Sequence, residues 1–130
     1  MIKVWISGCF DILHRGHIEL FKYAAELGDH LTVGADTDDR VNRSKGEGRP
    51  FNSLSDRVFI LRSIKYIDDV VHFSSDEELT TLIKNYSPDI ILAGSDWKGK
   101  NIVGEQHSKS VIFFDRVGDY STTSTLKCKE

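Results

Sequence analysis

Two histidines, His14 and His17, flank Gly16 in a ten-residue segment that follows an apolar run and opens a helical pattern. The first turn of a helix has free backbone N–H groups and the positive end of the helix dipole, so it attracts anions. Gly16 would let a phosphate approach the backbone closely. Both imidazoles could donate to that phosphate, and such donors stabilise the charge that grows during transfer at an α-phosphorus.

The residues alone leave other interpretations of this pair open. A histidine at a helix start is commonly a capping or surface residue. A histidine pair can also bind a metal ion, but no third ligand lies nearby in the sequence. Asp11, three residues before His14, could brace the loop or orient a histidine. The ten-residue context favours a functional role for the pair.

A second phosphate site is predicted near the C-terminus, where Ser121, Thr122 and Thr123 precede a short helical segment, Ser124–Lys127. Hydroxyls and backbone N–H groups at that helix start would bind phosphate oxygens. The alternative is an ordinary N-cap, which explains one hydroxyl better than three.

Cationic residues complete the candidate machinery. The polar, glycine-bearing stretch Thr37–Asn52 predicts a long loop, in which Arg43 and Lys45 would form a lid that neutralises phosphate charge. The alternative is a solvated loop. Arg57 lies at a predicted helix start, where the helix dipole disfavours a cation, and a substrate phosphate would explain its position.

Apolar runs and helical patterns alternate along the whole chain. The apolar runs predict five strands, at Ile2–Ser7, His30–Ala35, Asp69–Phe73, Asp89–Ala93 and Ser110–Phe114. Helical spacing and capping signals predict helices over His17–Leu27, from Ser53 to Ile64 and from Ser75 to Tyr86. Strand–helix alternation implies a parallel sheet with helices on both faces. We therefore predict an α/β fold, a single Rossmann-like domain over residues 1–130.

Ligands of such sheets bind beyond the carboxyl ends of the strands. Function is therefore expected in four segments: Gly8–His17, Asp36–Arg49, Gly94–Lys100 and Asp115–Thr123. Asp96 and Trp97 follow a strand end at Gly94, where contacts to a base or ribose are expected. Plain packing is the alternative for Trp97.

The bulk composition argues against several classes of protein. Apolar residues make up 39% and charged residues 28% of the 130 residues, which is typical of a soluble globular domain. The net charge of −3, with no basic stripe, argues against a nucleic-acid partner. No run approaches membrane-spanning length or forms a signal peptide, and Cys9 and Cys128 lack metal-like spacing. We expect a cytoplasmic protein with reduced thiols and no membrane partner.

The segment G-C-F-D-I-L-H-R-G-H resembles the G-x-F-D-x-x-H-x-G-H signature of the cytidylyltransferase-like nucleotidyltransferases. The resemblance continues through R-P-F-N-S-L-S-D-R at 49–57, I-K-Y-I-D-D-V-V at 64–71, G-S-D-W-K-G-K at 94–100 and R-V-G-D-Y-S-T-T at 116–123. It implies a homodimer in which an acceptor phosphate attacks a nucleotide α-phosphate directly, with no covalent enzyme intermediate. It also implies Mg²⁺, which would enter with the nucleotide rather than occupy a fixed protein site.

The resemblance further assigns roles to residues. Four would be catalytic: His14 and His17 at the α-phosphate, Lys45 at the leaving pyrophosphate, and Arg57 as an active-site arginine. The nucleotide would be bound by residues from several blocks: Gly8, Cys9, Phe10, Asp11, Gly16, Gly94, Asp96, Trp97, Arg116, Tyr120, Ser121, Thr122 and Thr123. The acceptor would contact Asp38, Arg43 and Lys65. Cys9 stands where related enzymes often have Cys or Thr, so its thiol is expected to pack rather than attack.

Two branches of the family share blocks with this chain. Trp97–Lys100 and Arg116 resemble the glycerol-3-phosphate cytidylyltransferases. Lys45–Pro50, Pro88-Asp89 and Ile102–Gly104 instead resemble the adenylyltransferase domain that makes ADP-activated heptose.

The choice between these branches depends on the base and the acceptor. A guanidinium at Arg116 could donate to the O2 carbonyl of cytosine, which adenine lacks, so we expect CMP transfer from CTP to a polyol phosphate resembling glycerol 3-phosphate. The heptose-like loop and the acidic stretch Ser74–Glu78 favour the alternative, adenylyl transfer from ATP to a heptose 1-phosphate-type sugar phosphate. A non-catalytic nucleotide-binding regulatory protein is a third possibility, against which the two histidines and Lys45 argue.

Overall fold

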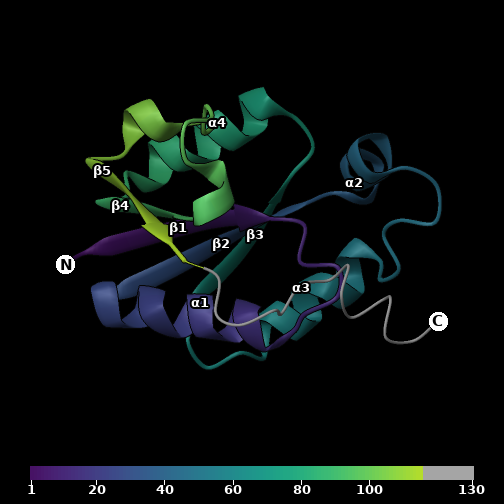
Figure 1. Cartoon of the computed structure of the whole chain (residues 1–130), viewed down its shortest axis with the longest axis horizontal. Coiled ribbons are helices and arrows are strands. Elements are labelled where there is room, and N and C mark those ends of the chain that lie inside the picture. Colours follow the sequence, from purple (N-terminus) through teal and green to yellow (C-terminus); the bar gives the residue numbers. More distant parts are fainter. Residues whose placement is uncertain (116–130) are drawn as a thin grey trace.

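The computed structural model describes residues 1–115, and residues 116–130 lie outside the described part. Strands and helices alternate along it (Figure 1). The strands are β1 (Lys3–Gly8), β2 (His30–Asp36), β3 (Asp69–Phe73), β4 (Ile90–Gly94) and β5 (Ser110–Phe114). The α-helices are α1 (Arg15–Leu27), α2 (Asp38–Lys45), α3 (Leu54–Arg62) and α4 (Asp76–Tyr86), and two short 3₁₀ turns are η1 (Ser95–Trp97) and η2 (Glu105–His107).

The five strands form one parallel sheet in the order β3-β2-β1-β4-β5. The chain runs outward from β1 to β3 and then returns to place β4 on the other side of β1. The strand order therefore reverses between β1 and β4, which is where such sheets bind ligands at their carboxyl ends. This arrangement confirms the predicted Rossmann-like α/β fold.

Two hydrophobic clusters lie on opposite faces of the sheet. Along β1, Val4 and Ile6 belong to one cluster and Trp5 to the other, because successive strand residues point to opposite faces. Helices α1 and α3 cover the first face, and α4 covers the second (Figure 1). Strand interiors buried on both sides explain why the predicted strands are near-continuous apolar runs.

The five predicted strands agree with the observed ones to within a residue at each end. The predicted loop Thr37–Asn52 is wrong in its first half, because residues 38–45 form α2. Acidic residues in the first turn and Arg43 and Lys45 in the last turn complement the helix dipole. Gly46, with φ of 90°, then ends the helix. Any lid is thus the short stretch after Lys45.

Within residues 1–115 no helix has the length and apolar character that crossing a membrane requires. The longest, α1, has 13 residues.

Candidate active site

The turn after β1 depends on a close approach between Gly8 and Phe10. Phe10 has φ of 53°, in the left-handed region, and its ring lies so close to Gly8 that a Cβ there would be 2.7 Å from Phe10 Cζ. The same ring packs against Phe21 and His17, at centroid distances of 5.4 and 5.8 Å. Gly8 and Phe10 therefore shape the turn that leads to the histidines, by packing and backbone conformation.

The two histidines cap α1 reciprocally. His14 is the N-cap residue, and its Nδ1 accepts a hydrogen bond from the Gly16 N–H at 3.0 Å. The His14 N–H in turn donates to Nδ1 of His17 at 3.2 Å. Because both Nδ1 atoms are acceptors, each neutral imidazole carries its proton on Nε2. The two rings lie 3.9 Å apart between centroids.

His17 is held neutral near physiological pH. Burial, with the neighbouring His14 as a smaller cause, lowers the pKa of His17 to about 4. A neutral imidazole with a proton on Nε2 is a hydrogen-bond donor that does not need to change its charge state when an anion arrives. The cap therefore leaves His17 as a hydrogen-bond donor through Nε2 rather than as a general base.

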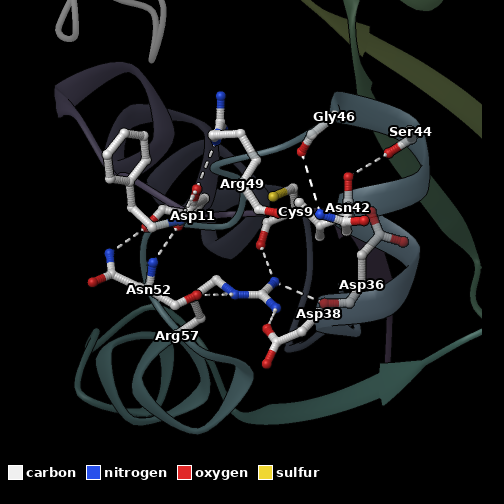
Figure 2. Close-up of polar contacts among 12 residues, drawn as sticks. Cys9, Asp11, Asp36, Asp38, Asn42, Ser44, Gly46, Arg49, Asn52 and Arg57 are labelled. Atoms are coloured by element: carbon white, nitrogen blue, oxygen red, sulfur yellow. Dashed lines mark hydrogen bonds and ion pairs between the residues drawn. The ribbon is translucent and has the colours of Figure 1, made fainter.

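Asp11 joins the histidine loop to the segment that precedes α3 (Figure 2). Its Oδ2 accepts from Arg49 Nε and from the Phe51 N–H, and its Oδ1 from the Asn52 N–H, all at 2.8 Å. Burial alone would raise the pKa of Asp11, but these bonds outweigh it and hold the pKa below its ordinary value. Both oxygens bind protein groups, so the structure gives Asp11 the bracing role.

Arg57 is completely buried, and four of its N–H bonds bind the protein (Figure 2). Its Nη1 donates to the carbonyl oxygens of Cys9 at 2.8 Å and Asp36 at 2.7 Å. Its Nε donates to the Asn52 carbonyl and its Nη2 to Asp38 Oδ1. These acceptors explain a cation at the start of α3, which the sequence attributed to a substrate phosphate. Direct contact of Arg57 with substrate is not supported by this geometry.

Arg57 also contacts Cys9, through its carbonyl oxygen, and Asp38, through its carboxylate. Burial raises the pKa of the Cys9 thiol, although the charge of Arg57 opposes the shift. A thiol with a raised pKa is a poor nucleophile, in keeping with the expectation that Cys9 packs. Asp38 has one oxygen on Arg57, and its side chain is half exposed.

Two adjoining cavities open at the carboxyl ends of the strands. The larger, of about 930 Å³, is called the polar cavity and is lined by Cys9, Asp36, Arg40, Arg43, Ser44, Lys45, Ser74, Ser75, Asp76, Glu77 and Trp97. The smaller, of about 180 Å³, is called the apolar cavity, and its walls include Gly8, Phe73, Leu79, Gly94, Ile102 and Val103. Asp36, Arg40 and Trp97 line both, so they form the boundary between the two cavities.

Helix α2 is held against the start of α4 by Arg40, which was not among the predicted site residues, and by Arg43, which was expected at the acceptor. Arg40 bonds Asp36 Oδ1 through Nε at 2.8 Å and Asp76 Oδ1 through Nη2 at 2.6 Å. Arg43, three residues along α2, donates to the Ser74 carbonyl at 3.1 Å. The sequence offered one signal for Arg40, because Asp36 precedes it by four residues and such a pair can form an ion pair on a helix. This signal could be used only if α2 was recognised as a helix.

The structure brings some of the remaining predicted site residues to the two cavities and leaves others away from them. Lys45 ends α2 and lines the polar cavity without a hydrogen bond or ion pair to a described residue. Gly94 and Trp97 line the apolar cavity, and Asp96 lies against Gly94, where a Cβ would be 2.8 Å from its Oδ1. Lys65 is not brought to either cavity. The predictions for Arg116, Tyr120, Ser121, Thr122 and Thr123, and for the helix Ser124–Lys127, concern residues outside the described part.

The topology of the sheet explains why Lys65 lies away from the cavities. It precedes β3, whose first residue Asp69 pairs with Thr32, whereas the last residue Phe73 pairs with Asp36 at the site. Lys65 therefore lies toward the amino ends of the strands, and its ammonium sits over the Tyr66 ring at 5.2 Å.

Among residues 1–115 no group of three or more His, Cys, Asp or Glu side chains is placed to hold a metal ion. Asp11 is fully hydrogen-bonded and Asp36 is paired with Arg40.

The chain is similar to a known protein family and to several relatives that share one name. Residues 5–130 match the model of the family described as cytidylyltransferase-like. Proteins named bifunctional protein HldE are 45% identical in Campylobacter concisus, 44% in Nitratiruptor and 40% in Helicobacter hepaticus, each over 124 residues. Each alignment covers 95% of this chain but 26–27% of the relative, so the chain spans about a quarter of their length.

Two solved structures share the fold. A lipopolysaccharide core biosynthesis protein from Thermoplasma volcanium superposes with a TM-score of 0.70 at 24% identity, over 93% of this chain and 99% of that one. Pantothenate synthetase from Thermus thermophilus does so with 0.58 at 13% identity, over 95% and 64%. At these identities the likeness is one of fold.

Replacing Arg57 with lysine should destabilise the protein by about 3 kcal/mol, because an ammonium cannot bind three carbonyls and a carboxylate in the same plane. Arg62→Lys, an exposed change on the same helix, is the matched control and should stay within about 0.5 kcal/mol. Urea unfolding followed by circular dichroism measures both. Equal stability of the two variants would contradict the role given to Arg57.

Asp11→Asn should cost about 2 kcal/mol in the free energy of unfolding, because an amide NH₂ would face backbone N–H donors and Arg49 would lose its counter-charge. Asp39→Asn, on the exposed side of α2, serves as the control with little change expected. The same unfolding measurement decides, and a loss no larger than in the control would refute the bracing role.

The low pKa of His17 predicts a pH-dependent stability. Between about pH 6.5 and pH 4 the unfolded chain binds a proton at this residue and the folded chain does not, so stability falls as pH falls through that window. Wild type should lose about 3 kcal/mol more than His17→Asn between pH 7 and pH 4. Parallel stability profiles for the two proteins would show that His17 titrates normally.

Proposed function

The chain belongs to the cytidylyltransferase-like family and is a nucleotidyltransferase, and we propose that it transfers AMP from ATP to a heptose 1-phosphate-type sugar phosphate. In this reaction an oxygen of the acceptor phosphate forms a bond to the α-phosphorus of ATP. The bond from that phosphorus to the β-phosphate bridge breaks, and pyrophosphate leaves. The product is an ADP-activated sugar.

The structural observation that supports the transfer reaction in this proposal is the reciprocal cap of His14 and His17. It leaves the proton of each neutral ring on Nε2, at the positive end of α1, close to Gly16. Negative charge grows on the non-bridging oxygens of the α-phosphate as the acceptor attacks. Donors held in place before the reaction stabilise that charge without reorganising.

Mg²⁺ fits this site as a companion of the nucleotide. The ion is commonly bound by one or two carboxylates together with substrate phosphates rather than by an all-protein cage. Asp38, half exposed with one oxygen on Arg57, is a described carboxylate that could join such a set. When bound, the ion would neutralise phosphate charge, and the chain's own residues would orient the reacting groups.

The polar cavity suits a sugar phosphate. Lys45 and Arg43 stand on the α2 side and can attract a phosphate, whereas Glu77 stands on the α4 side, beside Asp76, which is paired with Arg40. Carboxylates accept hydrogen bonds from sugar hydroxyls and repel a second phosphate. Trp97, half exposed at the boundary, offers a flat apolar surface to a sugar ring. A cavity with opposite charges on its two walls therefore favours an acceptor with one phosphate and a neutral ring.

The proposal replaces the preference for CTP and glycerol 3-phosphate that the sequence suggested. Relatives 38–45% identical are named bifunctional protein HldE, which points to the adenylyltransferase branch. The chain shares with that branch the blocks at Lys45–Pro50 and Ile102–Gly104. The cytosine argument depended on Arg116, which lies outside the described residues. The homodimer and the cytoplasmic location remain predictions.

A panel of substrates tests the proposal. Pyrophosphate release is measured with Mg²⁺ and with ATP or CTP, each against heptose 1-phosphate and glycerol 3-phosphate. We expect ATP with heptose 1-phosphate to give the highest kcat/KM, by a factor of about 100 or more. A preference for CTP with glycerol 3-phosphate would overturn the choice of substrates, and no turnover with any pair would favour a regulatory nucleotide-binding protein.

His14→Ala and His17→Ala should each lower kcat by roughly 10²–10³, because each loses a donor to the transition state. Each variant also loses half of the helix cap, at a cost of about 1 kcal/mol, so circular dichroism must first confirm folding. Arg15→Ala, exposed between them, is the control and should keep its activity. Near-normal turnover in both histidine variants would refute this mechanism.

A further inference from the structure

Three cations of helix α2 line the polar cavity, and they differ in what neutralises their charge. Within the described residues, Arg43 donates to two backbone carbonyls, and Lys45 has no hydrogen bond or ion pair. Arg40 instead lies between two carboxylates, with Asp36 at 2.8 Å and Asp76 at 2.6 Å. A cation without a carboxylate partner attracts a phosphate more strongly than a neutralised one, so a substrate phosphate is expected at Arg43 and Lys45.

Asp36, Arg40 and Asp76 together form what is called the Arg40 cluster. The guanidinium carbon of Arg40 lies 5.3 Å from the centroid of the Phe73 ring, and this packing fixes the plane of the guanidinium. Nε faces Asp36 Oδ1, and Nη2 faces Asp76 Oδ1. No described residue is hydrogen-bonded to Arg40 Nη1 or to Oδ2 of either carboxylate. All three side chains line the polar cavity, so this unused hydrogen-bonding capacity is available to a ligand there.

The unused atoms of the Arg40 cluster alternate between acceptor and donor. They are a carboxylate oxygen, a guanidinium N–H and a second carboxylate oxygen. A hydroxyl group donates one hydrogen bond and also accepts, so two adjacent hydroxyls can each donate to one carboxylate while both accept from the guanidinium between them. A phosphate dianion offers acceptors alone and is repelled where carboxylates outnumber the guanidinium. The pattern therefore fits a pair of neighbouring hydroxyls.

Partial burial strengthens the hydrogen bonds that this cluster can make. The side chain of Asp36 is 20% exposed and that of Arg40 is 27% exposed. Burial raises the pKa of Asp36, although the charge of Arg40 opposes the shift, so this carboxylate is poorly solvated. A hydroxyl that donates to it restores a hydrogen bond that burial has removed.

We infer that the Arg40 cluster is a subsite that binds two adjacent hydroxyls of the acceptor. Arg40 donates to both hydroxyl oxygens, and Asp36 and Asp76 each accept from one hydroxyl. The phosphate of the same acceptor lies against Arg43 and Lys45 on the wall of the same cavity. The inference rests on the proposed function in taking the polar cavity as the acceptor side, but it applies to any acceptor with adjacent hydroxyls. Arg40 thereby determines specificity for hydroxylated acceptors.

Acceptors that each lack one hydroxyl test the subsite. With ATP and Mg²⁺, kcat/KM is measured for heptose 1-phosphate and for its single-deoxy analogues. In wild type, the loss of either of two adjacent hydroxyls should lower kcat/KM about 100-fold, because partly buried partners are left unpaired. In Arg40→Met both losses should shrink to about tenfold or less, whereas the KM for ATP should stay within about twofold of the wild-type value.

A purely structural role of Arg40 in holding α2 to α4 predicts a different result. A structural defect would lower kcat/KM for every acceptor by the same factor and leave the ratios between acceptors unchanged. Arg40→Lys keeps a cation between the two carboxylates, so it should fold even if Arg40→Met does not, but it lacks the planar fork and should lose about tenfold in discrimination. Arg62→Lys, the same change at an exposed position on α3, is the control and should keep the wild-type ratios.

Unchanged ratios in the folded Arg40 variants, or wild-type losses that do not fall on two adjacent hydroxyls, would overturn the subsite. If the substrate panel selects CTP with glycerol 3-phosphate, the proposed function fails, and the single-deoxy forms of glycerol 3-phosphate then test the subsite in the same way. If no pair is turned over, calorimetric titration with heptose 1-phosphate decides. Binding about tenfold weaker to Arg40→Lys than to wild type would support the subsite, and equal binding or none would overturn it.

Discussion

The buried guanidinium of Arg57 is the interaction on which the site depends. It binds the ends of β1 and β2 through the carbonyls of Cys9 and Asp36, and the start of α2 through Asp38. Carbonyls at strand ends have no partner in the sheet, so a single planar donor satisfies acceptors that would otherwise be buried without a bond. Because the donor comes from α3, the helix, two strand ends and the turn before the histidines are held in one arrangement.

A second constraint prepares the chemistry. Asp11 fixes the segment at Arg49–Asn52 to the histidine loop, and the histidines fix one another through the α1 cap. The charges nearest the turn are paired, whereas the donors that would face a phosphate are neutral N–H groups. Lys45 and Arg43 lie on the wall of the polar cavity, where their positive charge can neutralise a phosphate that binds there. The cations of this chain thus differ in role according to their burial. The buried Arg57 stabilises the fold, and the cavity-lining Lys45 and Arg43 are available to a substrate.

Helix α3 connects the core of the sheet to the site. Its inner side supplies the buried Arg57, and Leu61 of the same helix belongs to the core. A nine-residue helix has little intrinsic stability, so these packing contacts are what hold it in place. The same contacts therefore stabilise the helix and position the guanidinium that binds the active-site turns.

The sequence by itself determined the order and limits of the strands, the Rossmann-like fold and the histidine motif, because strand burial, helical spacing and the G-x-F-D-x-x-H-x-G-H pattern are local signals. It also placed Lys45 at the site. It could not decide that Arg57 and Asp11 bind protein groups, since all of their partners except the Asn52 carbonyl bound by Arg57 lie 19 to 48 positions away in the chain. It missed α2, whose polar sequence offers a single buried residue, Val41, and it placed Lys65 at the site although β3 begins at the other end of the sheet. Only the tertiary structure decides which donors meet which acceptors, because a buried arginine and a phosphate-binding arginine have the same local sequence and differ only in what surrounds them.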